Sequence, residues 1–267
     1  MISALIIAKD EESNIGSCLD SLQGFADETI VVVDSSSTDE TEQISRSKGA
    51  RVLITDWQGF AATKSWGLRH TSGEFIIWID ADERMTPELA EEIKNTIQSD
   101  RCFSALAFPR KAYFLGRWIQ HCGWYPGYVT RLFKKEKAKF DDKQVHEMLV
   151  VDGKVVRLKE ALLHYTDPDL THYFVKFNKY TQLAAEQMYQ SGCRFKTSGA
   201  FLKPLLVFVK MYFVKLGFLD GREGFILCTL SAYYTFVKNI KLWEIQQHPA
   251  NTPSANEKVN GNKQQPQ

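Results

Sequence analysis

Four short apolar runs alternate with amphipathic segments through the first hundred residues. Each run is rich in bulky apolar residues, and the four cover residues 3–8, 28–34, 50–55 and 74–80. Between them, residues 13–22, 38–48 and 61–70 have helical spacing, and Thr86 with Pro87 predicts a fourth helix that ends near Ser99. Ser37 and Glu40 stand in capping-box relation at the start of the second helix. This alternation predicts an α/β fold with a doubly wound, mostly parallel sheet.

The pattern changes after residue 100. Shorter β-like runs cover residues 103–109, 129–134 and 145–151, and residues 169–190 read as an amphipathic helix. Two apolar runs follow at 200–219 and 224–237. The second holds 14 uncharged residues, against roughly 20 needed to cross a bilayer, and three lysines interrupt the first, so no span is expected. We expect one α/β domain over 1–165, a helical, basic and apolar extension over 166–245, and a disordered tail over 246–267.

The net charge of +1 conceals an uneven distribution. Residues 194–243 contain eight Lys and Arg against two acidic residues, whereas residues 1–193 contain 28 acidic residues against 23 Lys and Arg. Basic apolar helices suit the interface of an anionic membrane. They equally suit a helical cap whose lysines extend into water. We expect peripheral membrane contact through 194–243 and no nucleic-acid partner.

The cysteines and the first residues favour a cytoplasmic protein. The five cysteines are scattered and include no CxxC pair, so they indicate neither a zinc site nor a disulfide framework. The N-terminus lacks a basic region and runs directly into the charged residues 9–12. It therefore predicts a first strand rather than a signal peptide.

Two carboxylates stand at the end of the fourth apolar run: Asp80 is its last residue, and Asp82 follows after Ala81. Open α/β sheets bind ligands beyond the carboxyl ends of their strands. Paired carboxylates there suit a hard divalent cation that shares its other positions with water and substrate phosphates. Acidic residues also decorate helix N-termini, and Thr86 begins a helix nearby.

Asp34 ends another buried strand and is followed by the hydroxyl-rich residues 35–38. Its carboxylate suits hydrogen bonds from a base or ribose, and the following helix start favours an anion. Ser37, Thr38 and Asp39 equally suit ordinary helix capping.

As a set, these segments resemble the family 2 glycosyltransferases. The resemblance rests on IIAKDEE (6–12), VDSSSTD (33–39), AATKSWGL (61–68) and DADE (80–83). Later pieces are similar to the branch that includes the β-1,4-glucosyltransferases of the lipopolysaccharide inner core: GWYPG (123–127), RLF (131–133) and VHE (145–147). The resemblance implies a GT-A fold and inverting transfer of glucose or another hexose from a nucleotide sugar, with UDP expected ahead of GDP. It also implies a glycolipid or glycan acceptor, and so a place at the cytoplasmic face of the inner membrane.

The resemblance also implies roles for single residues. Glu12 and Asp34 would face the nucleoside, and Asp10 would also bind the donor. Lys64, where the family usually has arginine, would line the donor site. Asp80 would contact ribose or metal. Asp82 would bind the Mg²⁺ or Mn²⁺ that bridges the diphosphate. Lys9-Asp10 replaces the more frequent Tyr-Asn, and Ser65 replaces a frequent Asn, which affects the finer nucleoside contacts.

The transfer reaction needs a stabilised leaving group and a base. A metal on Asp82 would act as the Lewis acid, with His146 in its shell and Arg131 or Lys64 as a further cationic contact. A carboxylate must reach the acceptor hydroxyl. The candidates, in order of preference, are Glu147, Asp142 and Asp141, although a His-Glu pair on a β-like run also suits a surface salt bridge.

An aromatic cluster in the stretch 116–127 and just after it suits acceptor binding, because aromatic faces stack on sugar rings. Trp124 and Tyr125 are the first candidates, beside Trp118 and Tyr128. The same residues suit a loop that is folded onto the domain by its own side chains.

Other function classes remain open. A sugar-phosphate nucleotidyltransferase usually has a glycine-rich, basic loop after the first strand, where this chain has KDEE, and a dinucleotide oxidoreductase would need GxGxxG there. A non-catalytic protein that binds a nucleotide sugar or a membrane is the third class, and the intact acidic pair argues against it. Metal-dependent release of free nucleoside diphosphate is expected of the transferase alone.

Overall fold

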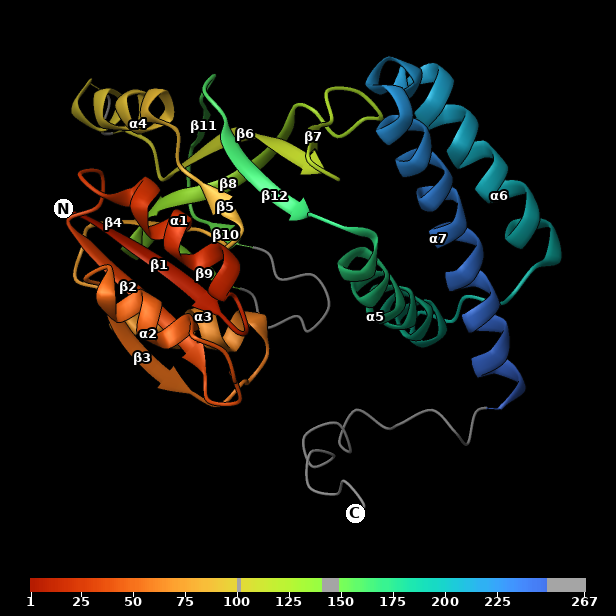
Figure 1. Cartoon of the computed structure of the whole chain (residues 1–267), viewed down its shortest axis with the longest axis horizontal. Helices are drawn as coiled ribbons and strands as arrows, with labels where there is room; N and C mark the ends of the chain where they lie inside the picture. The colour runs from red at the N-terminus through yellow and green to blue at the C-terminus, as the bar shows by residue number, and fades with distance from the viewer. Residues whose placement is uncertain (100–101, 141–148, 249–267) are drawn as a thin grey trace. The chain divides into compact units, whose positions relative to one another are not determined.

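The computed structural model describes residues 1–99, 102–140 and 149–248, and the chain divides into two units, Met1–Pro168 and Asp169–Gln267. Strands and helices alternate through the first half of the first unit, and the described part of the second unit is helical (Figure 1).

The first half of the sheet consists of four parallel strands. They lie in the order β3-β2-β1-β4 and correspond to the four apolar runs: β1 (Ile2–Ala8), β2 (Glu28–Asp34), β3 (Arg51–Thr55) and β4 (Phe75–Trp78). The chain moves outward from β1 to β3 and then returns to the other side of β1. The strand order therefore reverses between β1 and β4, the usual position of a ligand crevice in such sheets.

Helices cover both faces of these strands. Helices α1 (Glu12–Leu22), α2 (Thr41–Ser47) and α4 (Pro87–Ser99) contribute to a core with alternate strand residues such as Ile6 and Val31. The other face, with Leu5 and Val32, packs on α3 (Phe60–Arg69). Gly67 permits this close approach, since a Cβ there would lie 2.7 Å from Leu5 Cδ1 and 2.9 Å from Val32 Cγ2.

One predicted helix cap is confirmed and another is wrong. Thr86 Oγ1 accepts the N–H of Leu89 at 3.1 Å and so caps α4 as expected. The capping box of Ser37 and Glu40 does not form, because α2 begins only at Thr41, whose N–H donates to Asp39 Oδ1 at 3.0 Å.

The rest of the sheet is mixed and continues as β4-β8-β6-β12-β5. Its strands are β5 (Glu83–Arg84), β6 (Ala105–Phe114), β7 (Arg117–Trp118), β8 (Gly127–Lys134), β11 (Val155–Arg157) and β12 (Leu162–Asp167). Strand β8 runs antiparallel to β4 and β6, whereas β12 runs parallel to β6. After a 3-10 turn, Lys135–Lys137, β9 (Ala138–Phe140) pairs with β10 (Leu149–Val151). Residues 145–148 of the strand expected at 145–151 lie outside the described residues.

The sheet must curl to accommodate β5. Strands β4 and β5 are consecutive and joined by residues 79–82, yet β8, β6 and β12 lie between them in the sheet. Four strand spacings span roughly 19 Å in a flat sheet, whereas five residue steps reach about 18 Å when fully extended. The connection is not extended, because Glu83 N–H donates to the Asp80 carbonyl at 3.0 Å. Curling therefore brings the last strand back beside the loop that carries Asp80 and Asp82.

The second unit is helical. It comprises α5 (Leu170–Gln190), α6 (Thr197–Val209), a π-helical continuation (Lys210–Val214), a 3-10 turn (Gly217–Asp220) and α7 (Gly221–Gln247). Asp169 caps α5 by accepting the N–H of His172 at 2.8 Å. Ala185, Leu242 and Ile245 form a small core between α5 and α7.

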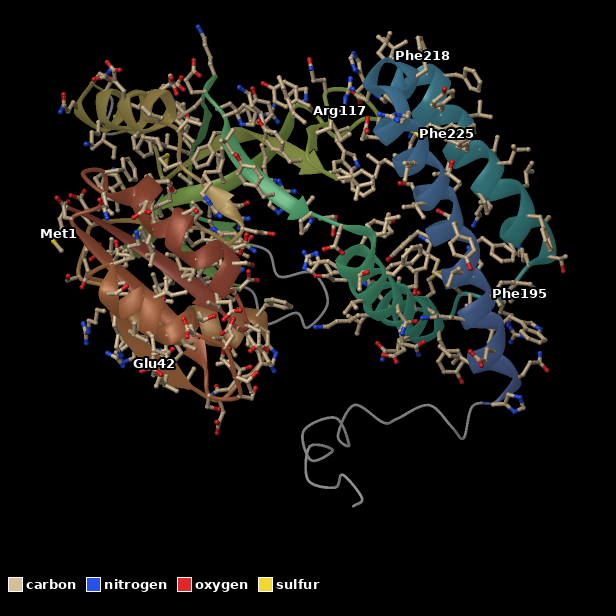
Figure 2. All side chains as sticks on the ribbon, in the orientation of Figure 1. Met1, Glu42, Arg117, Phe195, Phe218 and Phe225 are labelled. Carbon is tan, nitrogen blue, oxygen red and sulfur yellow. The ribbon has the colours of Figure 1, made fainter. Side chains whose placement is uncertain are left out.

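Much apolar surface of this unit stays exposed, as the side chains of Phe218 and Phe225 illustrate (Figure 2). Among the described residues, the stretch Thr197–Val214 has the length and composition of a membrane span. The lysines within it, Lys203 and Lys210, disfavour a span because a charged side chain is costly in the hydrocarbon.

Candidate active site

Asp34 and Asp80 occupy the carboxyl ends of neighbouring parallel strands. Asp34 ends β2, and Asp80 follows β4 by two residues, on either side of β1. The structure therefore brings both to one edge of the sheet, as the sequence predicts, at the reversal of strand order.

Asp80 pairs with a buried arginine. Its Oδ2 lies 2.5 Å from Nη2 of Arg131, which comes from β8. Burial alone would raise the pKa of Asp80, but the charges of Arg131 and Lys64 together with the hydrogen bond from Arg131 hold it at about 2. Asp80 is therefore ionised throughout the physiological range.

Glu83 binds the same nitrogen of Arg131 as Asp80 does. Its fully buried carboxylate accepts Arg131 Nη2 at 2.7 Å, lies 3.5 Å from Arg110 Nη1, and accepts the Asp80 N–H at 3.0 Å. Burial raises the pKa of Glu83 against the charge of Arg131. No role for Glu83 was predicted, because only the curl of the sheet brings β6 and β8 to it.

Trp78 supports two cations of the site. Its ring centroid lies 3.5 Å from Arg131 Cζ and 3.7 Å from Lys64 Nζ, and its indole N–H donates to the Thr130 carbonyl. Lys64 is buried on α3. Cation–π contacts offset part of the cost of burying these charges. Lys64 and Arg131, which were both predicted to bind the sugar donor, are thereby held against the ring of Trp78 beside Asp80.

Asp82 faces a histidine that the sequence analysis missed. His164 Nε2 on β12 lies 3.2 Å from Asp82 Oδ2, and the Tyr165 N–H donates to the Asp82 carbonyl at 2.9 Å. His164 Nδ1 is buried with no hydrogen-bond partner in the described part of the chain. Pairing between β5 and β12 creates this contact, so sequence spacing gave no signal for it.

Carboxylate oxygens suit both Mn²⁺ and Mg²⁺, and a neutral imidazole can also bind Mn²⁺. Within the described residues, no three His, Cys, Asp or Glu side chains gather closely enough to hold a metal by themselves. Asp82 and His164 supply two such groups, and a cation that shares its shell with phosphates and water needs few protein ligands. The residues present therefore fit such a metal.

Two residues predicted to bind the donor, Asp10 and Glu12, bind the neighbouring loop. Asp10, at φ 53°, accepts the Thr38 N–H at 2.8 Å, and Glu12 accepts the Glu40 N–H at 3.1 Å. The loops after β1 and β2 are thus joined through their side chains.

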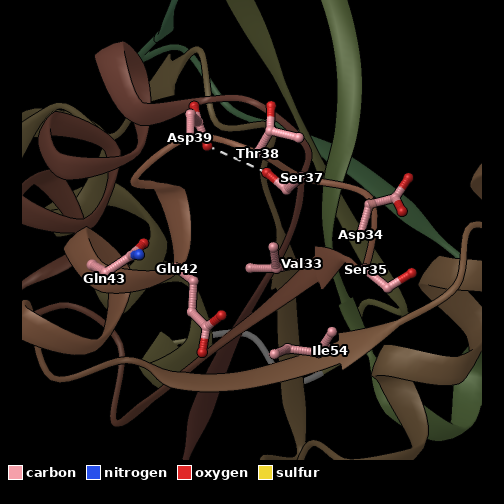
Figure 3. A pocket seen from close by; sticks show the side chains of 9 residues that line it. All are labelled: Val33, Asp34, Ser35, Ser37, Thr38, Asp39, Glu42, Gln43 and Ile54. Atoms are coloured by element: carbon pink, nitrogen blue, oxygen red, sulfur yellow. Dashed lines mark hydrogen bonds between the residues drawn. The ribbon is translucent and has the colours of Figure 1, made fainter. Parts of the chain in front are cut away.

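Asp34 is buried and accepts both the N–H and the hydroxyl of Ser36, while its Oδ2 lies 3.7 Å from Lys9 Nζ. Its carboxylate points away from the side chain of Glu42 (Figure 3). A cavity of about 210 Å³ opens between the end of β2 and α2. Asp39 and Glu42 line this cavity along with Asp34, so its lining is acidic and does not suit a diphosphate.

The aromatic residues predicted to bind the acceptor pack on neighbouring rings. Trp124 meets Phe114 edge-on at 6.3 Å, and Tyr125 meets Trp118 edge-on at 5.4 Å. These contacts agree with a loop folded by its own side chains and leave acceptor binding as a prediction. Four candidates for the base and the metal shell, Asp141, Asp142, His146 and Glu147, lie outside the described residues.

Comparison with known proteins finds similar sequences over most of this chain. The model of Glycosyl transferase family 2 matches residues 3–165. An uncharacterized glycosyltransferase of Rickettsia conorii is 28% identical over 98% of this chain and 96% of its own length. The lipopolysaccharide core biosynthesis glycosyltransferase LpsC of Rhizobium meliloti is 30% identical over 91% of this chain and 92% of its own length.

Among solved structures, the mannosyltransferase PcManGT from Pyrobaculum calidifontis, in complex with GDP-Man and Mn²⁺, superposes with a TM-score of 0.53 at 14% identity, over 91% of this chain and 86% of that one. The expected GT-A fold, with a mostly parallel sheet and a helical C-terminal part, is confirmed.

Proposed function

The chain belongs to glycosyl transferase family 2, and from this membership we propose that it transfers a hexose, glucose foremost, from a UDP-sugar to a hydroxyl of the lipopolysaccharide core with inversion. The similarity to LpsC over nearly the whole of both chains supports the acceptor class. The observation that carries the donor site is the Asp80–Asp82 loop at the strand reversal, with Arg131 and Lys64 held beside it on Trp78.

The described residues divide the work of donor binding. Asp82, with His164 and Asp80 nearby, would hold Mn²⁺ or Mg²⁺, which when bound would stabilise the charge on the departing diphosphate. Arg131 and Lys64 add fixed positive charge in a partly water-excluded site, where it acts most strongly. Asp34 remains the candidate for nucleoside recognition. Asp10 and Glu12 would act there through the loop they hold.

The acceptor hydroxyl must lose a proton as it attacks the anomeric carbon from the face opposite the leaving group. A carboxylate within hydrogen-bond reach is the expected acceptor of that proton. We assign this role to Glu147, with Asp142 second. His146 remains a proposed member of the metal shell, and Trp124 and Tyr125 remain proposed acceptor contacts.

We further propose that the helical extension binds the cytoplasmic face of the inner membrane. One stripe of α6 and its continuation exposes large apolar side chains, 63% exposed for Phe201 and 69% for Val214; the others include Leu202, Leu205, Leu206, Val209 and Phe213. Patches of this kind on soluble proteins mark interaction surfaces. Lys203, Lys210 and Lys215 are exposed along the same segment and suit anionic headgroups.

Lysine positions favour a helix that lies in the interface over one that spans the membrane. A span over Thr197–Val214 would place Lys203 and Lys210 within the hydrocarbon, at about 3 kcal/mol each near the centre. An in-plane helix keeps both ammonium groups among the headgroups. We therefore assign transfer to residues 1–165 and peripheral membrane contact to 166–245.

Calorimetry tests the donor site directly. UDP, GDP and ADP are each titrated into wild type and Asp82→Ala, with Mn²⁺ and with EDTA. We expect UDP to bind in a way that needs both the metal and Asp82. If no nucleotide shows metal-linked binding to folded wild-type protein, the proposed transfer reaction is wrong.

A further inference from the structure

Helices α6 and α7 of the second unit lie side by side and run in opposite directions (Figure 1). Their aromatic rings meet at two levels. The centroids of Phe201 and Phe236 lie 5.8 Å apart, and those of Phe208 and Phe225 lie 5.9 Å apart. A later residue of α6 thus contacts an earlier residue of α7, as in an antiparallel pair. The turn of α6 around Phe201 therefore faces the turn of α7 around Phe236.

Each of these facing turns carries a lysine that folds back along its own helix. Lys203 passes over Gly199, since a Cβ on that glycine would lie 3.7 Å from Lys203 Cε. Lys238 Nζ lies 5.5 Å from the ring centroid of Tyr234, one turn earlier on α7. Long side chains on helices point toward the N-terminus of their helix, so in an antiparallel pair these two cross the same turn. We call Lys203 and Lys238 the lysine pair.

The positive charge of the lysine pair is not neutralised within the described part of the chain, where neither ammonium group forms an ion pair with an acidic side chain. Lys238 is half-buried, and its pKa is lowered, first by burial and then by the charge of Lys203. The next lysine of α7 differs: Lys241 donates to the Asn178 carbonyl and to Thr181 Oγ1, both at 2.9 Å. The fold therefore binds one ammonium group of α7 and leaves another beside a like charge.

We propose that the lysine pair binds the phosphate monoester of a membrane-lipid headgroup. Such a group carries nearly two negative charges at neutral pH and three strong acceptor oxygens. It can therefore accept charge-assisted hydrogen bonds from both ammonium groups at once. The exposed Leu202, Leu205 and Leu206 on the same helix suit the acyl region of that lipid. The phosphate site rests on the geometry of the two helices, whereas the choice of a lipid rests on the proposed membrane contact.

Co-sedimentation of the full chain with two kinds of phosphatidylcholine vesicle tests this assignment. One kind contains phosphatidic acid, a phosphate monoester, and the other contains phosphatidylglycerol, a diester; their amounts are adjusted to equal zeta potential. We expect wild type to partition into the phosphatidic acid vesicles about tenfold more strongly. The double variant Lys203→Gln, Lys238→Gln should lose this preference.

The matched control is the double variant Lys210→Gln, Lys215→Gln, which removes the same charge from the same unit. It should weaken binding to both kinds of vesicle equally and keep the tenfold preference. Circular dichroism establishes that both variants are folded. A preference that persists in the first variant, or that disappears equally in the control, overturns the assignment.

Two further outcomes separate this assignment from the proposed membrane contact. Equal partition of wild type into the two kinds of vesicle overturns the phosphate site and leaves the membrane contact standing. Binding of folded wild type to neither kind rejects the membrane contact and, with it, a lipid as the ligand. Saturable binding of glycerol 3-phosphate to that same protein, lost in Lys203→Gln, Lys238→Gln, would then assign a soluble phosphate instead.

Discussion

His164 Nε2 lies 3.2 Å from Asp82 Oδ2, although Asp82 belongs to the loop before β5 and His164 to β12, far apart in the sequence. The contact places an imidazole beside the carboxylate that most resembles a metal ligand, on the strand that closes the curled sheet. It makes His164 a candidate donor-site residue that no motif indicated.

Replacing His164 should weaken metal-dependent nucleotide binding. With His164→Ala, we expect the Kd of UDP in Mn²⁺ to rise about tenfold, because the metal loses a ligand or the carboxylate loses its partner. Binding in EDTA should not change. His172→Ala, on an exposed position of α5, should behave as wild type in the same calorimetry. An unaltered Kd in Mn²⁺ would remove His164 from the site.

Truncating Glu83 should destabilise the first unit. Glu83→Ala leaves Arg131 and Arg110 without their buried partner, and breaking such a pair typically costs about 3 kcal/mol of unfolding free energy. Urea denaturation measures the change. Glu42→Ala removes an exposed pair with Arg46 and should cost less than about 0.5 kcal/mol. Equal losses in the two variants would contradict the buried network.

Asp80→Asn should lower stability in a pH-dependent way. The folded pKa of Asp80, about 2, lies below its ordinary 3.8. Its ionised form therefore stabilises the fold above pH 4, and this contribution fades as the pH falls toward 2. Near neutrality we expect a loss of about 1 kcal/mol, allowing for solvent screening of a partly exposed carboxylate. Urea midpoints should converge below pH 4; a gap that widens on acidification would reverse the assignment.

Charge reversal on α6 should weaken membrane binding. Lys203→Glu should lower the partition coefficient into phosphatidylglycerol-containing vesicles about fivefold or more. Leu205→Ser should also lower this coefficient, by an amount that depends less on salt concentration. Co-sedimentation measures both. Lys159→Glu, an exposed lysine of the first unit, is the control. If the wild-type protein does not bind anionic vesicles and is instead dimeric in solution, the proposed membrane contact is wrong and the apolar stripe binds a second copy of the chain.

Glu147→Gln should abolish transfer while UDP binding survives, since the amide cannot accept the acceptor proton. Product formation and calorimetry on the same sample separate chemistry from binding. Turnover close to that of wild type would move the role to Asp142, for which Asp142→Asn is the next variant.

Elements governed by local pattern were predictable. The runs that become β1 to β4 and the helices between them follow from periodicity, and Asp34 and Asp80 reach one edge because parallel strands end together. Capping at α2 was not predictable in detail. Asp39 accepts the N–H of Thr41 at the start of α2, whereas Ser37 Oγ accepts the N–H of Asp10 in the neighbouring loop. Composition does not rank such competing hydroxyl and carboxylate acceptors.

Contacts between strands that are far apart in the sequence could not be predicted. Glu83 meets Arg110 and Arg131, and Asp82 meets His164, only once the sheet has curled. The register of β5 on β12 sets both, and two-residue strands have no periodicity from which to infer register. Lys64 was predicted to line the donor site, but its cation–π contact with Trp78 could not be predicted because it depends on how α3 packs on β4.

The short connection from β4 to β5 has a consequence for the order of folding. Asp80 and Asp82 lie in the connection between β4 and β5. Strand β5 is the last strand in the order of the sheet and pairs with β12, so it can join the sheet only after residues 105–167 have formed the strands between β4 and β5. Such long-range closures form late, since their loop entropy must be overcome first. During synthesis on the ribosome, Asp34 and the strands around it would therefore be in place well before the pair of Asp82 and His164. A ligand that bound at Asp82 would then report the completion of the fold.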